Sequence, residues 1–151
     1  KIIGEKFLAN NFENYHIFRI SNMFASHGGA KGTFLHTMLN NIKKNIIDFD
    51  VCKDSIRDFV PISFVAEILN SNCYDVENGI YNLSSNVTLT IKELIDVIID
   101  SNKINKNKLK YTFGNNKVSQ TLDNSKIVSA FKVNKLSKRN ILDFIGDIDA
   151  K

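Results

Sequence analysis

The sequence predicts a layered α/β protein whose helices cover a mostly parallel sheet. Helical and strand-like segments alternate along nearly the whole chain, and the strand-like segments are short and apolar with no clean polar face. Strands of this kind are typically buried on both sides, as in a parallel sheet. The sequence has one proline and only short clusters of glycine, serine and asparagine, so we expect no linker and a single unit over residues 1–151.

The first 52 residues predict two helices and two strands. Apolar residues at three-to-four spacing indicate an amphipathic helix over residues 1–13 and a second helix over residues 34–42. Residues 16–21 are rich in β-favouring side chains and predict a buried strand, whereas the adjacent glycines within residues 22–31 predict a loop. Apolar and polar side chains alternate over residues 45–52, which predicts a further strand.

The middle of the chain predicts a strand, a helix and another strand. A polar turn at residues 53–55 is followed by a short extended segment over residues 56–60. Pro61 suits the first turn of a helix, where its missing N–H loses no partner, and the apolar spacing continues this helix over residues 62–71. Residues 79–83 predict another buried strand.

The last part of the chain predicts further helices and one strand. Thr90 and Glu93 have the spacing of a capping box, in which each side chain accepts a hydrogen bond from the other residue's backbone N–H. They open a helix that continues through Ile99, and a strand is expected over residues 109–113. The caps of the two final helices are expected at Asp123 or Asn124 and at Ser137.

Composition places the chain among ordinary globular proteins. Of its 151 residues, 43% are hydrophobic and 24% are charged, and 20 basic against 16 acidic residues give a net charge of +4. The excess is spread along the chain, and the lysines of residues 103–110 are interleaved with asparagine rather than aromatic residues, so we expect no nucleic-acid or membrane partner. No apolar stretch approaches the roughly 20 residues that cross a bilayer.

The histidines and cysteines predict neither a metal site nor a disulfide framework. His16, His27 and His36 lack ligand spacing with one another and with Cys52 and Cys73, so we expect no metal. Two cysteines fit reduced thiols in a cytoplasmic protein, although the sequence leaves a single bridge between them open.

Three segments in a fixed order carry a family resemblance. The chain begins Lys1-Ile2-Ile3-Gly4-Glu5, continues with Arg19-Ile20-Ser21-Asn22-Met23-Phe24, and later has Arg57-Asp58-Phe59-Val60 followed by Val65-Ala66-Glu67. These segments resemble motifs of the extended short-chain dehydrogenase/reductase family, which comprises the NAD-dependent epimerases and dehydratases of nucleotide sugars. The family motifs are, in order, Lys-x-x-Gly-Glu, Arg-x-x-Asn-x-Tyr-Gly, and Arg-Asp-Phe-Val followed by Asp-Val-Ala. Residues 79–85 and 122–126 are weaker matches in the same order.

The resemblance implies a partial Rossmann-like NAD(P)-binding fold plus the small C-terminal substrate-binding α/β subdomain. In that family the glycine-rich phosphate turn, the residue that selects NAD or NADP and the catalytic tyrosine all precede the position that Lys1 matches. The sequence starts without Met and directly in a helical pattern. We therefore expect an N-terminal portion to be missing, and residues 1–151 to be the C-terminal part of an epimerase/dehydratase domain.

Lys1 and Ile20 are the residues that the resemblance assigns to the cofactor. Lys1 matches the family's catalytic lysine, which lies beside the nicotinamide ribose of NAD or NADP and lowers the pKa of a tyrosine one helical turn earlier, because a nearby positive charge favours the phenolate. The alternative is a solvated lysine at the chain end. Ile20 would lie near the nicotinamide, although a core position explains an apolar residue there equally well.

Asn22 and Arg57 are the residues that the resemblance assigns to a nucleotide-sugar substrate. The Asn22 amide can donate and accept without charge, and the Arg57 guanidinium can bind a diphosphate through two parallel hydrogen bonds. The alternatives are an asparagine that stabilises its own turn and an arginine that forms a surface pair with Asp54 or Asp58.

The function implied by the resemblance is that of an NAD(P)-dependent nucleotide-sugar epimerase or dehydratase. This chain lacks the glycine-rich turn and the catalytic tyrosine, so we expect it to be inactive alone. The alternatives are a non-catalytic nucleotide-sugar-binding module and a structural fragment that dimerises through residues 1–13. Departures from the family motifs, such as Ala25-Ser26 in place of Gly-Pro and Ser63-Phe64 in place of an acidic pair, leave the nucleotide and the sugar open.

Overall fold

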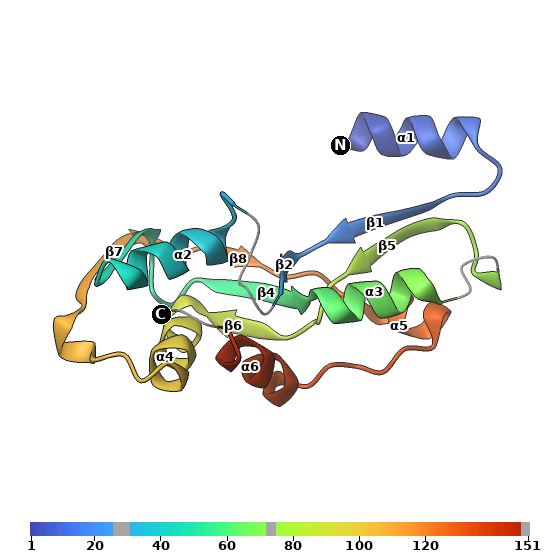
Figure 1. Ribbon diagram of the computed structural model, residues 1–151. Coiled ribbons are helices and arrows are strands. Elements are labelled where there is room, and N and C mark those ends of the chain that lie inside the picture. Colours follow the sequence, from blue (N-terminus) through green and yellow to red (C-terminus); the bar gives the residue numbers. More distant parts are fainter. Residues whose placement is uncertain (26–30, 72–74, 149–151) are drawn as a thin grey trace.

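The computed structural model describes residues 1–25, 31–71 and 75–148 and has the expected α/β architecture (Figure 1). The helices are α1 (Ile2–Asn11), α2 (Phe34–Lys43), α3 (Ile62–Asn70), α4 (Ile91–Ser101), α5 (Ser125–Phe131) and α6 (Lys138–Gly146), with a 3-10 turn at Lys106–Lys108. The strands are β1 (His16–Ile20), β2 (Asn22–Phe24), β3 (Ile46–Val51), β4 (Ile56–Pro61), β5 (Gly79–Leu83), β6 (Thr88–Thr90), β7 (Lys110–Asn116) and β8 (Ser119–Gln120).

Strand β4 is the centre of the strand pairing. It pairs in parallel with β2 and with β8, and antiparallel with β6. Two further parallel pairs, β1 with β5 and β3 with β7, lie on either side of this group (Figure 1). The prediction of mostly parallel pairing is therefore confirmed, but the strands form several small sheets rather than one continuous sheet.

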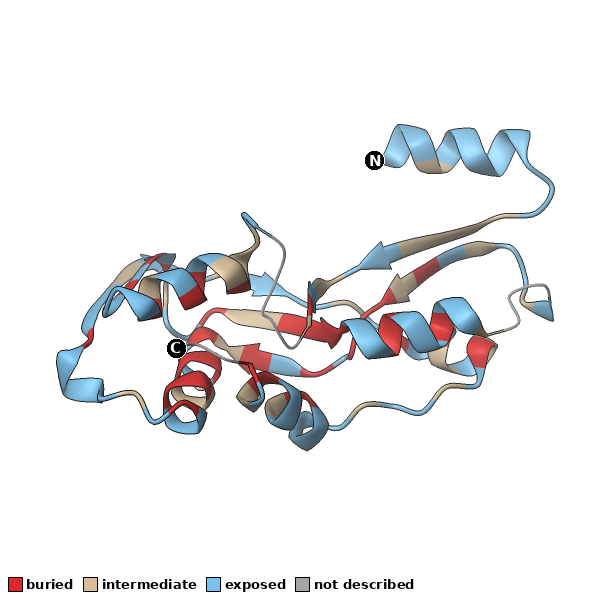
Figure 2. Ribbon diagram, viewed as in Figure 1, coloured by how far each residue is buried: buried red, intermediate tan, exposed pale blue. Residues whose placement is uncertain are grey.

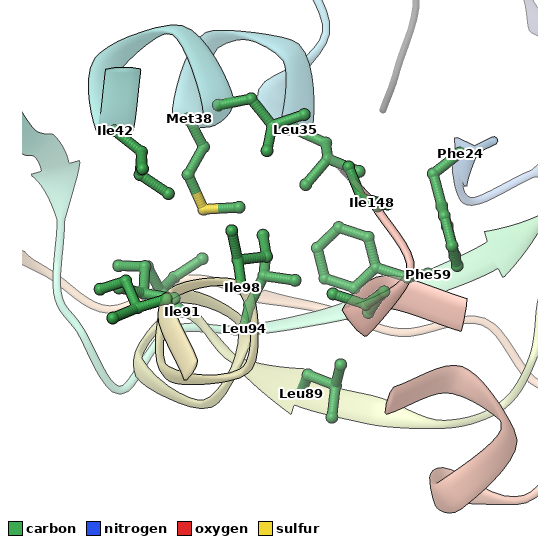
Figure 3. Packing of buried hydrophobic residues seen from close by; sticks show 14 of the residues in the cluster. Phe24, Leu35, Met38, Ile42, Phe59, Leu89, Ile91, Leu94, Ile98 and Ile148 are labelled. Carbon is green, nitrogen blue, oxygen red and sulfur yellow. The ribbon is translucent and has the colours of Figure 1, made fainter. Parts of the chain in front are cut away.

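The hydrophobic core has two parts. In the larger one, Leu35 and Met38 of α2 point toward Leu94 and Ile98 of α4, and Phe59 of β4 lies beside them (Figure 3). The smaller one lies between α3, β5 and α5 and includes Phe64, Ile68, Tyr81, Leu83 and Ile127. The larger part arises from the apolar spacing of the helices, since the buried residues of α2 and α4 recur every three or four positions.

Most of the predicted elements and caps are confirmed. The side chains of Ile47, Phe49 and Val51 are buried on β3, as the alternation predicts. Thr90 and Glu93 form the capping box of α4. Ser137 caps α6 in the same way, with Asn140 as its partner.

The N-terminal part of the chain differs from the prediction in its burial. Helix α1 buries none of its residues: Ile3 is 85% and Phe7 60% exposed (Figure 2). Strand β1 is not a buried strand, because its side chains are half-buried or exposed and Ile20 is 46% exposed. The ion pair between Glu5 of α1 and Arg19 of β1, at 2.7 Å, connects these two elements.

Three local predictions are corrected. Asn22–Phe24 is a strand rather than the start of a loop, because it pairs with the end of β4. Pro61 is the N-cap of α3 rather than its first helical residue. The strand expected at residues 109–113 runs instead from Lys110 to Asn116, and its pairing with β3 shifts register near Gly114, where a Cβ would lie 2.1 Å from the Asp50 carbonyl oxygen.

Predictions for several residues cannot be followed in the structure. The glycine pair of the expected loop, Ser26, His27 and Cys73 lie outside the described residues. Over the residues that the structure describes, no helix has both the length and the apolar character needed to span a bilayer.

Candidate functional site

The segment Ile20-Ser21-Asn22, between β1 and β2, forms a wall shared by two pockets. We call the first the β8 pocket; it has a volume of about 470 Å³, and its remaining lining residues are Ser119, Gln120, Thr121 and Leu122. We call the second the α2 pocket; it has a volume of about 390 Å³, and its remaining lining residues are Met23, Thr33, Phe34, Leu35 and Phe59. Both pockets thus open where β1 ends, at the carboxyl end of a parallel strand, which is where ligands bind in open α/β folds.

Asn22 lines both pockets and is also bound to the scaffold. Its side-chain Nδ2 donates a hydrogen bond of 2.8 Å to the backbone carbonyl of Asp58. The alternative of an asparagine that stabilises its own turn is therefore wrong: Asn22 lies on β2 and connects it to β4. The bond orients the amide but leaves acceptor capacity on Oδ1 for another group.

Arg57 of β4 contacts one residue from each pocket. Its Nη1 donates a hydrogen bond to Oε1 of Gln120 in the β8 pocket, and its Cζ lies 4.4 Å from the ring centroid of Phe34 in the α2 pocket. Its Nε is buried and has no hydrogen-bond partner among the described residues. An unpaired buried donor costs about 1–3 kcal/mol, so an acceptor that reached this nitrogen would be favoured.

The charge of Arg57 is not neutralised by a direct ion pair. The expected alternatives, pairs with Asp54 or Asp58, are absent from the ion pairs of residues 1–25, 31–71 and 75–148. Burial lowers the pKa of the Arg57 guanidinium, and the negative charge of Asp50 partly opposes this. A guanidinium stays charged despite such a shift, so Arg57 presents a partly desolvated positive charge beside the two pockets.

Asp58 faces the opposite way from Arg57, because neighbouring side chains on a strand alternate between its two sides. Its carboxyl group is 1% exposed and accepts hydrogen bonds at Oδ1 from the Ser21 hydroxyl at 3.0 Å and from the Ser85 backbone N–H at 3.1 Å. Burial raises the pKa of this carboxyl, although these hydrogen bonds act in the opposite direction. Asp58 thereby fixes the segment that forms the wall of both pockets.

Lys1 and Ile20, the two residues assigned to the cofactor, are in different surroundings. Ile20 lines both pockets, next to Asn22. Lys1 is exposed at the start of α1, and no hydrogen bond or ion pair within the described part of the chain joins its side chain to Asn22 or Arg57. The sequence also contains no glycine-rich G-x-G-x-x-G turn. The residues present therefore do not by themselves form a site for NAD or NADP.

The sequence did not indicate two residues that the structure brings to the site. Phe34 was expected only as the first apolar residue of a helix, and Gln120 carried no signal at all. Gln120 and Arg57 are 63 residues apart and meet because β8 pairs with β4 in the register Arg57↔Gln120. Pairing of short strands far apart in sequence leaves no periodic pattern, so only the folded chain reveals it.

Comparison with solved structures finds the same fold in enzymes that act on nucleotide sugars. UDP-N-acetylglucosamine 4-epimerase from Methanobrevibacter ruminantium M1, in complex with UDP-N-acetylmuramic acid, matches 96% of this chain with a TM-score of 0.75 at 14% identity. dTDP-glucose 4,6-dehydratase from Bacillus anthracis str. Ames, in complex with NAD, matches 97% with a TM-score of 0.73 at 13% identity. The enzyme WbmG of Bordetella bronchiseptica, in complex with NAD and UDP, matches 95% with a TM-score of 0.70 at 22% identity.

These likenesses establish the fold of the chain. The matches cover 48%, 48% and 46% of the three solved chains, so this chain spans about half the length of the structures that it matches. Neither protein-family models nor curated proteins give a match to the sequence. The described residues therefore have the Rossmann-like α/β fold that is found in about half of each of these structures.

The environment of Asp58 predicts a pH-dependent contribution to stability. An acid whose pKa is raised in the folded state binds its proton more tightly there than in the unfolded state, so the free energy of unfolding falls as the pH rises from the ordinary aspartate pKa to the raised one. Asp58→Asn retains an acceptor at Oδ1 and removes the charge. We expect the stability of this variant relative to wild type to improve as the pH rises above the ordinary aspartate pKa of about 4, measured by urea denaturation at a series of pH values.

Asp123→Asn is the control for this prediction. Hydrogen bonds from the Ser125 backbone N–H and hydroxyl lower the pKa of the Asp123 carboxyl. The stabilisation that Asp123 provides is therefore lost as the pH falls. Asp123→Asn should change the pH dependence of the free energy of unfolding with the opposite sign. If the free energy of unfolding changed with pH by the same amount in wild type and Asp58→Asn, burial would not raise the pKa of the Asp58 carboxyl.

Proposed function

We propose that this chain is the C-terminal, substrate-binding part of an NAD(P)-dependent nucleotide-sugar epimerase or dehydratase. The observation that carries the proposal is the Arg57 guanidinium, which has no ion-pair partner among the described residues and lies against residues of two pockets walled by Ile20-Ser21-Asn22. A partly desolvated guanidinium is well suited to a diphosphate, because parallel N–H donors match its oxygens. The fold shared with epimerases and dehydratases supports the same conclusion.

The two pockets differ in the groups that they offer to a nucleotide sugar. In the β8 pocket, Ser119 and Thr121 supply hydroxyl groups that suit a polyhydroxylated sugar. In the α2 pocket, the lining residues besides Phe34 include the apolar side chains of Met23 and Leu35, which suit the flat faces of a nucleobase. Arg57 would hold the diphosphate between them, and Asn22 would donate or accept a hydrogen bond at the same place.

NAD or NADP would be held mostly by residues outside this chain. When bound, the dinucleotide supplies transient hydride transfer to and from the sugar. Ile20 would bound the nicotinamide side of the site, and Lys1 would lower the pKa of a tyrosine one helical turn before it. The thiol of Cys52 is free, which fits the reducing cytoplasm, where we place the protein.

Replacement of Arg57 tests the assigned substrate class. Arg57→Ala should weaken the binding of UDP, or of whichever of ADP, GDP, CDP and dTDP binds best, by roughly 10-fold or more, because hydrogen bonds to charged groups contribute about 1.5–3 kcal/mol. Isothermal titration calorimetry measures this. Arg139→Ala is the matched control, because the Arg139 side chain is 91% exposed and its ion pair with Asp143 is long, at 3.9 Å. Equal affinity of wild type and Arg57→Ala would refute the proposal.

The missing cofactor elements predict that the 151-residue chain does not turn over alone. With NAD and a nucleotide sugar that binds, the absorbance band of NADH should not grow, and no product sugar should form. Sustained turnover would show that the chain contains a complete cofactor site. If a longer chain that includes a glycine-rich turn and the tyrosine also stays inactive, the protein is instead the non-catalytic binding module.

A homodimer is a second proposal, and the exposed apolar side chains of α1 favour it. Ile3 and Phe7 are 85% and 60% exposed, which is more than a folded chain ordinarily leaves to water on one helix. The double variant Ile3→Glu/Phe7→Glu should convert a dimer to a monomer in sedimentation or light scattering. Ile62→Glu on α3, where the side chain is 49% exposed, is the control and should leave the mass unchanged. A monomeric wild type would exclude this proposal.

A further inference from the structure

The Arg57 guanidinium is held by two residues that come from distant parts of the chain. The ring of Phe34, at the start of α2, covers one face of the guanidinium, with 4.4 Å between Cζ and the ring centroid. Oε1 of Gln120, on β8, accepts a hydrogen bond from Nη1. Arg57 itself lies on β4, so three elements determine where its charge is placed.

We propose that Phe34 and Gln120 are positioning residues, which hold the Arg57 guanidinium in place to bind the diphosphate of the substrate. This inference rests on the proposed function, because it assigns to these residues an effect on the same ligand. Neither residue has to touch that ligand for the effect to arise.

The hydrogen-bond geometry of a guanidinium supports this assignment. Nη1 is on the side of the group that faces the arginine stem, whereas the N–H groups of Nε and Nη2 are parallel and form the edge that matches two oxygens of one phosphate. Gln120 occupies Nη1, and the described residues give no hydrogen bond to Nε or Nη2. The protein therefore uses Nη1, the nitrogen that is less suited to bidentate binding, and makes no hydrogen bond of its own to Nη2 among the described residues.

The Phe34 ring is itself fixed, which makes it an effective support. It stacks on Phe49 with ring centroids 5.2 Å apart and lies tilted against Phe59 at 6.5 Å. Phe49 and Phe59 are both buried. A flexible arginine loses side-chain entropy when it binds a ligand, and prior contact with a fixed ring reduces that loss.

The first test needs no ligand. In the free protein, the Hε resonance of Arg57 should be shifted upfield by the Phe34 ring, and Phe34→Leu should return it toward the value of an exposed arginine. Phe113→Leu is the control, because Phe113 stacks on Phe49 at 6.2 Å without contacting Arg57 and so reports loss of packing alone. An Hε shift that is the same in wild type and Phe34→Leu would overturn the inference.

The second test is a double-mutant cycle on the binding of UDP by calorimetry. Phe34→Leu should weaken binding by roughly 2- to 30-fold, the range expected for loss of a cation–π contact. In the Arg57→Ala background it should cause no further loss, because it acts only through Arg57. Gln120→Ala should behave in the same way. Thermal melting of each variant confirms that it is folded.

The outcomes separate the two proposals. If the loss of UDP affinity caused by Phe34→Leu or Gln120→Ala simply adds to the loss caused by Arg57→Ala, that residue contacts the ligand directly. This result would overturn the positioning role, while the proposed function would stand. If Arg57→Ala binds UDP as tightly as wild type, or if wild type binds none of UDP, ADP, GDP, CDP and dTDP, the proposed function fails. A positioning role for the diphosphate then fails with it, even where the Hε shift shows that Phe34 holds the free guanidinium.

Discussion

The buried carboxyl of Asp58 joins the parts of the chain that make the candidate site. It lies on β4 and accepts hydrogen bonds from Ser21, which follows β1, and from Ser85, which follows β5. A nearly inaccessible carboxylate is costly to bury, and these bonds to Oδ1 offset part of the cost, whereas the buried Oδ2 has no hydrogen-bond partner among the described residues. Because the ends of β1 and β5 both reach its Oδ1, the position of the Ile20-Ser21-Asn22 wall follows from this one group.

Strand β4 uses its two faces for different purposes. The Asp58 side meets the ends of β1 and β5, whereas the neighbouring Arg57 is directed to Phe34 and Gln120 at the pockets. This division follows from the alternation of side chains on a strand. A structural carboxylate and a candidate binding cation can therefore be adjacent in sequence without pairing, which leaves the charge of Arg57 available to an anion.

The exposed N-terminal elements fit a chain that spans about half of the structures that it matches. Helix α1 contributes nothing to the two cores, and β1 is covered only in part. Apolar side chains such as Ile3 and Phe7 are stabilised when another surface removes them from water. The described core, by contrast, packs around β4, α4 and α6 without any contribution from α1.

The sequence by itself determined the local structure and indicated Asn22 and Arg57 as candidate binding residues. Apolar spacing located the helices, alternation located β3, and the Thr90–Glu93 pair located the start of α4, because each of these depends on residues within a few positions of one another. The motif around Arg57 and Asn22 indicated a binding site. Only the tertiary structure decided which residues complete it: Phe34 and Gln120 reach Arg57 through a helix start and a short strand pairing far away in the chain. Contacts of that kind depend on register and packing across the whole fold, which no short stretch of sequence encodes.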